Sequence, residues 1–145
     1  MPSTKRRLAF FTILALVLIA GLPACSSGGA TLDMMDMEHM PQSVQEAPTN
    51  VSDAYRFAAA NPDLMQQFPC YCGCGSIGHT SNYACYVSGA DAAGNLIFDS
   101  HALGCQICVD ITLDVMRMLG DGEEVPDIQV VIDQTYGRYG PSNLP

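Results

Sequence analysis

Positive charge is scarce in this sequence of 145 residues, in which six Lys and Arg stand against 15 Asp and Glu. Three of the six, Lys5, Arg6 and Arg7, precede residue 24, so removal of residues 1–24 would take the formal net charge from −9 to −12. Nucleic acid and anionic lipid headgroups are bound through basic surfaces, which such a chain cannot build. Nucleic acid is therefore excluded as a partner, whereas cations are attracted.

The sequence also lacks an apolar run long enough for a transmembrane helix. Its longest run, residues 8–22, is shorter than the roughly 20 residues that a spanning helix needs. The run follows a basic start and leads into Leu22-Pro23-Ala24-Cys25, an order typical of an export signal that resembles a lipobox except at Pro23. We therefore predict a signal peptide over residues 1–24 and a lipid anchor on Cys25, with acyl chains such as palmitate holding the protein at the extracytoplasmic face of the cell membrane.

No nucleophile with a general base at a recognisable spacing is visible, so we do not expect an enzyme. Cys105-Gln106-Ile107-Cys108 is followed by Val109 rather than histidine, which argues against a c-type haem. The βαβ pattern that surrounds thioredoxin-like Cys-x-x-Cys motifs is also missing. A thiol–disulfide oxidoreductase that uses Cys105 and Cys108 is therefore only an alternative.

Composition divides the chain after the signal peptide into two parts. Residues 25–51 contain Gly, Ser and Pro without a lasting apolar period, which predicts a flexible tether between the lipid anchor and the domain. Within the tether, four methionines and one histidine resemble the flexible arms of exported copper-handling proteins: Met34, Met35, Met37, His39 and Met40. A disordered acidic linker is the other interpretation of this segment. Residues 52–145 form the predicted domain.

The domain is predicted to be mainly α with a small β-hairpin. Helical spacing or helix-start signals begin at Ser52, at Pro62 and at Pro126, and the strongest helical pattern covers residues 105–119. Short apolar runs at residues 83–87 and 96–98 flank a polar, Gly-containing segment and predict a hairpin. The Gly-rich residues 70–78 are expected to form a loop.

Six cysteines and two histidines are the outstanding feature of the domain: Cys70, Cys72, Cys74, Cys85, Cys105, Cys108, His79 and His101. Outside the cytosol, six cysteines commonly form three disulfides, for which 15 connectivities exist. However, Cys70, Cys72 and Cys74 are too close to pair with one another without strain, so all three would need distant partners. A disulfide-stapled interaction module therefore remains a second alternative.

Metal binding makes better use of this crowding. Gly73 allows the backbone to curl, so that several thiolates can converge on one centre. Cys105 and Cys108 are three residues apart at a predicted helix start, where they share a face and where the helix dipole favours thiolates. We predict a compact Cys-rich domain organised around a metal–thiolate site whose ligands are these six cysteines and both histidines.

Ligand softness narrows the choice of metal, since thiolates select Cu(I), zinc or iron–sulfur centres. Six thiolates exceed what one tetrahedral zinc ion can use, whereas bridging thiolates can hold several Cu(I) ions. Arg6-Arg7 matches a twin-arginine signal only in part, so export of an unfolded chain is favoured, which disfavours iron–sulfur clusters inserted before export. The prediction is a polynuclear Cu(I) site, with zinc second, that captures, buffers or delivers copper. Another copper protein of the envelope is the expected partner.

The hexapeptide Pro69-Cys70-Tyr71-Cys72-Gly73-Cys74 resembles the motif of the PCYCGC-motif proteins, a group of exported bacterial lipoproteins of obscure function. The resemblance extends from about residue 52 to 140 and includes His79, Asn82, Cys85, His101, the Gly104–Ile111 segment and Tyr136-Gly137. It implies an anchored location and a shared set of cysteines. It implies no reaction, so the metal prediction depends on the ligands themselves.

Overall fold

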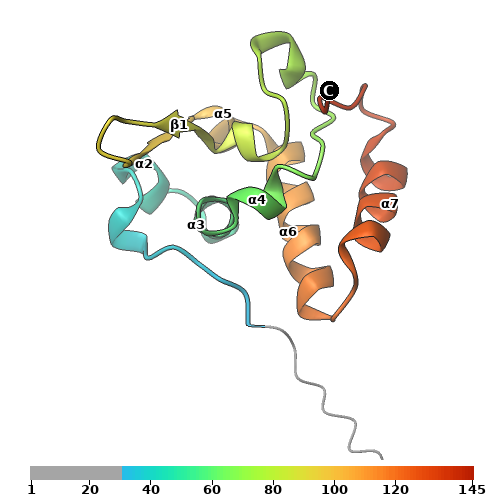
Figure 1. The fold of residues 1–145 in the computed structure, drawn as a ribbon, viewed down its shortest axis with the longest axis horizontal. Helices are drawn as coiled ribbons and strands as arrows, with labels where there is room; N and C mark the ends of the chain where they lie inside the picture. The colour runs from blue at the N-terminus through green and yellow to red at the C-terminus, as the bar shows by residue number, and fades with distance from the viewer. Residues whose placement is uncertain (1–30) are drawn as a thin grey trace, which may run out of the picture.

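The computed structural model describes residues 31–145, so the predicted signal peptide and Cys25 lie outside the described residues (Figure 1). The helices are α2 (Gln42–Gln45), α3 (Thr49–Ala60), α4 (Pro62–Met65), α5 (His101–Gly104), α6 (Gln106–Gly120) and α7 (Val125–Tyr136). The strands are β1 (Val87–Ala90) and β2 (Leu96–Phe98), and the 3-10 turns are η1 (Met37–His39), η2 (Cys74–Ile77) and η3 (Tyr83–Cys85). The prediction of a mainly helical domain with one antiparallel hairpin is confirmed.

Three longer helices supply most of the core. α6 lies beside both α3 and α7 (Figure 1). The helical spacing of α6 buries Ile111 and Val115 on the face that meets these neighbours, and α7 buries Ile128 and Ile132. Pro126 lies in the first turn of α7, where its missing N–H costs no hydrogen bond. Within the described residues, no helix combines the length and apolar character required to cross a membrane.

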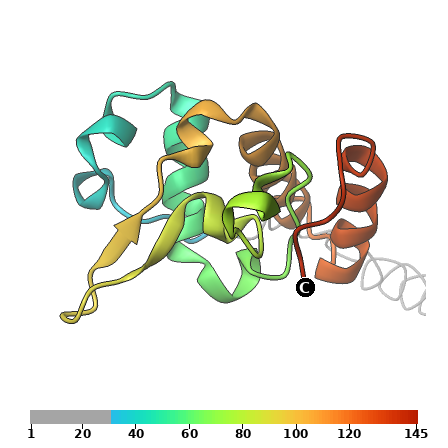
Figure 2. The same cartoon turned by 90° about the horizontal axis from the view of Figure 1, so that it is seen from above.

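The hairpin begins later than the sequence pattern indicated. Residues 83–85 form the turn η3 rather than strand, and β1 begins at Val87, which pairs with Phe98. The register shifts between Val87 and Gly89, so the hairpin carries a bulge next to the core. Figure 2 shows the hairpin and α7 at opposite sides of the domain.

The structure differs from the predicted flexible tether over residues 25–51. From residue 31 onward this segment packs on the domain, and Val44 is 1% exposed. The backbone N–H of Met35 donates to the Arg56 carbonyl at 3.1 Å, and Arg56 Nε donates back to the Met35 carbonyl at 2.8 Å. Single apolar residues that show no period can still fill gaps beside a helix, so composition alone misjudged this segment. Helix α3 accordingly begins at Thr49, before the expected start of the domain.

The methionines of the predicted copper arm are part of this packing. Met40 is 3% exposed and belongs to the core, and Met34, Met35 and Met37 are partly buried against it. Only His39 is exposed, beside two acidic residues. The thioethers of the described segment therefore serve packing, as methionine commonly does in irregular gaps, rather than forming a flexible arm.

Candidate metal centre

A tight loop positions the first three cysteines. Pro69 separates α4 from Cys70, and the chain then runs through Cys72 and Cys74 into η2. Gly73 has φ 86°, in the left-handed region that favours glycine, so the backbone between the second and third cysteine takes a conformation that other residues rarely adopt. The three sulfur atoms consequently lie within 4.8 Å of one another, as predicted from their spacing.

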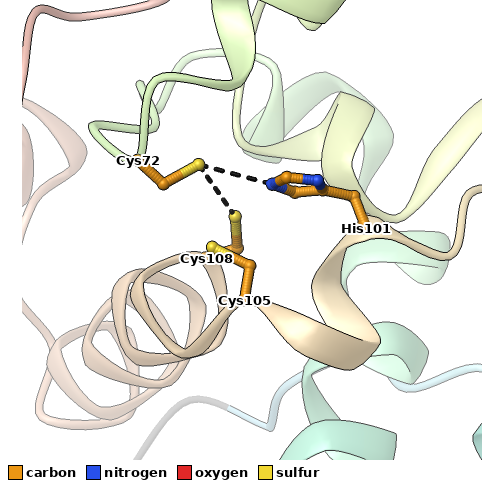
Figure 3. Close-up of side chains that lie close together, drawn as sticks. All are labelled: Cys72, His101, Cys105 and Cys108. Atoms are coloured by element: carbon orange, nitrogen blue, oxygen red, sulfur yellow. Dashed lines mark hydrogen bonds between the residues drawn. The ribbon is translucent and has the colours of Figure 1, made fainter.

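Other elements bring the remaining candidate ligands to this loop. Cys105 is the N-cap of α6, and Cys108 lies in the first turn of the same helix. His101 opens the short helix α5, and Cys85 ends η3. Figure 3 shows the side chains of Cys105, Cys108, His101 and Cys72 pointing toward one another from α6, α5 and the loop.

The sulfur atoms are close but not bonded. Sγ of Cys70 lies 3.2 Å from Sγ of Cys108 and 3.4 Å from Sγ of Cys72. Sγ of Cys74 lies 3.6 Å from Sγ of Cys85, and all six cysteines are free thiols. Thiolates about 2.3 Å from a tetrahedral metal ion are about 3.8 Å apart, so these spacings fit a common metal centre.

The structure brings all eight predicted ligands into one continuous cluster. One quartet consists of Cys72, His101, Cys105 and Cys108, and a second consists of Cys74, His79, Cys85 and His101. Within each quartet, one ligand atom from each residue lies within 4.8 Å of the others. Cys70 joins them, because it groups with Cys72 and Cys74 and also with Cys85 and Cys108. This set of sulfur and nitrogen atoms could hold a metal ion.

Burial and mutual hydrogen bonding control the charge of the thiols. The nearby Cys108 thiol, followed by Cys85, stabilises the Cys70 thiolate and lowers the pKa of Cys70. The same bonds to Cys70 and Cys85, together with burial, raise the pKa of Cys108. Burial also raises the pKa of Cys72 and of Cys74. In Cys108 these bonds and burial act against the partial charge of the helix end, so the pKa is raised and not lowered as the helix start alone predicted.

His79 is oriented as a metal ligand would be. Its Nε2 lies 3.4 Å from Oδ2 of Asp99, while its Nδ1 is buried and has no hydrogen-bond partner among the described residues. A buried polar atom left unpaired costs about 1–3 kcal/mol, a cost that coordination to a metal would remove. A carboxylate behind the second ring nitrogen is the usual companion of a metal-binding histidine. The residues present thus fit a bound ion.

Asp99 holds both histidines, although sequence reasoning did not single it out. Its second oxygen, Oδ1, accepts the backbone N–H of His101 at 2.7 Å at the start of α5. Tyr55 in turn donates its hydroxyl to the Asp99 carbonyl at 2.7 Å, which ties this segment to α3. The only hint in the sequence was that Asp99 stands two residues before the candidate ligand His101.

Asn143, near the C-terminus, fastens the cysteine loop and was also missed. Its Oδ1 accepts the Cys70 N–H at 2.6 Å, and its Nδ2 donates to the carbonyls of His79 and Ser81 at 3.1 Å each. A Cβ at Gly140 would lie 2.8 Å from the Tyr71 carbonyl oxygen, so glycine lets the chain pass close to the loop. In Figure 1 the C-terminus accordingly lies beside this loop. No short-range pattern could have revealed this contact.

A buried polar network fixes the start of α6 beneath the cluster. Tyr86 donates its hydroxyl to the Cys108 carbonyl at 2.8 Å, and Asn82 donates to the same carbonyl at 3.3 Å. Thr112 Oγ1 donates to the Asn82 side-chain oxygen at 2.8 Å, and all three side chains are buried. Buried polar groups that satisfy one another in this way give the cluster a rigid support.

The fold and the cluster define a small, mainly helical, cysteine-rich domain in which loop, turn and helix-start residues converge on one potential metal centre. The chain belongs to the family described as "Protein of unknown function with PCYCGC motif", whose model matches residues 24–144. The family resemblance seen in the sequence is thereby confirmed, over a longer range than expected. Comparisons with curated proteins and with solved structures found no match.

Proposed function

We propose that this protein captures soft metal ions, Cu(I) foremost and zinc second, and buffers them or delivers them without catalysis. The observation that carries the proposal is the continuous cluster of six thiols and two imidazoles. Thiolate sulfur favours Cu(I) over the hard cations that oxygen ligands select. Two overlapping quartets linked by Cys70 provide more sulfur than one ion needs, which favours a polynuclear centre.

The proposed location is the extracytoplasmic face of the cell membrane, with the chain exported by residues 1–24 and anchored through a lipid on Cys25. In that compartment the domain would meet copper after export. The low content of basic residues supports attachment by acyl chains rather than by a basic patch. Another copper protein of the envelope is the proposed source or recipient of the ion.

The test is a Cu(I) titration of the reduced full chain, purified in detergent without oxygen. We expect binding to saturate above one ion per chain, with luminescence that grows as solvent-excluded copper–thiolate groups form and that collapses on acidification. Cys72→Ser and Cys108→Ser should each lower the capacity. Ile77→Ser, which changes an exposed side chain in the adjoining turn η2, is the matched control and should retain it.

Two results would contradict the proposal. If protein isolated from its envelope holds three disulfides and takes up copper only after reduction, the chain is a disulfide-stapled interaction module. If instead it catalyses disulfide exchange and Cys105→Ser abolishes this turnover, the oxidoreductase alternative is correct.

A further inference from the structure

The two quartets of the cluster differ in chemistry. The first, around Cys72 and Cys105, contains three sulfurs and one nitrogen, and Cys70 adds a further sulfur beside Cys72 and Cys108. The second contains two sulfurs, from Cys74 and Cys85, and two nitrogens, from His79 and His101. His101 is common to both quartets. If His101 serves the second quartet, the first retains only sulfur donors, from Cys72, Cys105, Cys108 and the adjacent Cys70.

The second quartet has the features of a built site. Cys74 is 3% exposed and Cys85 is fully buried, and the side chain of His79 is 10% exposed. The rings of His79 and His101 meet edge to face with centroids 5.1 Å apart. Nδ1 of His79 is buried and has no hydrogen-bond partner among the described residues, while Nε2 lies beside the Asp99 carboxylate. An imidazole lone pair is therefore available among buried ligands.

Two thiolates and two imidazoles in a four-ligand set are the donors typical of zinc rather than of a copper–thiolate group. We propose that Cys74, Cys85, His79 and His101 form a separate ion position for a borderline divalent cation such as Zn(II), next to a sulfur-rich part that takes Cu(I), and that Asp99 is the positioning residue that keeps Nδ1 of His79 free for the ion. This inference rests on the proposed function and assigns a different ion to one part of the same cluster.

The role of Asp99 follows from the two tautomers of a neutral histidine. A carboxylate beside Nε2 can only accept a hydrogen bond, so the ring proton stays on Nε2 and Nδ1 keeps its lone pair. In Asp99→Asn, the oxygen that accepts the His101 N–H can be retained, while an amide N–H would face His79. That N–H would donate to Nε2, move the ring proton to Nδ1 and block coordination there.

The test compares Zn(II) and Cu(I) uptake by the reduced full chain and its variants, with Co(II) as a spectroscopic substitute for Zn(II). His79→Ala should lose one Zn(II) per chain, and Co(II) bound to it should lose the spectrum of a mixed thiolate–imidazole site. His79→Gln, which can still donate to Asp99, should behave in the same way and guards against a folding defect. Val130→Ala, which changes an exposed residue of α7, should leave all values unaltered.

Asp99→Asn should weaken binding of that same Zn(II) by about 10–100-fold, while copper luminescence and Cu(I) capacity of the sulfur-rich part persist. The proposal is overturned if both His79 variants retain the full Zn(II) count and the wild-type Co(II) spectrum. A parallel loss of Zn(II) and Cu(I) binding in Asp99→Asn would assign Asp99 a merely structural role. Failure of the wild-type chain to bind more than one Cu(I) would refute the proposed function instead. The Zn(II) counts of the wild-type chain and its variants would still test the separate Zn(II) position.

Discussion

The replacement Asn143→Ala tests whether the C-terminal residues organise the candidate metal centre. The change removes three hydrogen bonds of 2.6–3.1 Å that join the tail to the carbonyls of His79 and Ser81 and to the Cys70 N–H, and a longer one of 3.5 Å from Nδ2 to Sγ of Cys74. A typical hydrogen bond contributes about 0.5–1.5 kcal/mol net. Because this site is partly buried, water can replace some of the bonds, and we expect a loss of about 2 kcal/mol in the free energy of unfolding.

The same change should weaken metal binding. If the loop is no longer held in place without metal, binding must pay for ordering it, and 2 kcal/mol corresponds to roughly 30-fold in affinity. Urea unfolding of the metal-free reduced chain measures the first effect, and Cu(I) competition with a chelator measures the second.

Ser142→Ala is the matched control, since it changes the neighbouring exposed residue. It should alter neither quantity by more than about 0.5 kcal/mol. If Asn143→Ala changes stability no more than this control does, the tail does not clamp the loop and the reasoning from these hydrogen bonds is refuted.

Three further changes test other parts of the molecule. Val44→Ala should destabilise the protein by about 2 kcal/mol, while exposed Val131→Ala should not; equal effects in urea unfolding would mean that residues 31–48 do not pack as described. Cys25→Ser should release the protein from membranes or leave an uncleaved precursor in fractionation, and an unchanged membrane-bound mature form would refute lipidation. Because buried thiols with raised pKa must lose protons to bind metal, Cu(I) addition should acidify a weakly buffered solution and affinity should fall as pH falls; uptake without proton release would contradict their protonated state.

The sequence predicted well those features that depend on neighbouring residues. Helix α6 follows from the spacing of Ile111 and Val115, and the loop at Cys70 follows from Pro69 and the glycines that come after it. The set of candidate ligands could also be read directly, because thiols and imidazoles are side chains that soft and borderline metal ions select. A helix or a turn depends mainly on residues close together in the sequence, so the sequence pattern alone can predict it.

Long-range contacts explain where prediction failed. Residues 31–48 show no helical or strand-like apolar period. Met40 and Val44 are nevertheless buried, because they pack in the same core cluster as the buried residues of α3. The pKa of Cys108 is raised because of its contact with Cys70 and its burial, and neither is visible in a Cys-x-x-Cys spacing.

The amino-acid sequence thus sets the helical class of the domain, the loop position of the first three cysteines and the identity of the candidate soft ligands. The tertiary structure alone decided how these ligands divide into two overlapping quartets, that Asp99 faces His79, and that Asn143 holds the loop. The physical reason is that coordination chemistry needs atoms within a few ångströms of one another. For residues as distant in sequence as Cys70 and Asn143, only the packing of the helices and the path of the tail set those distances.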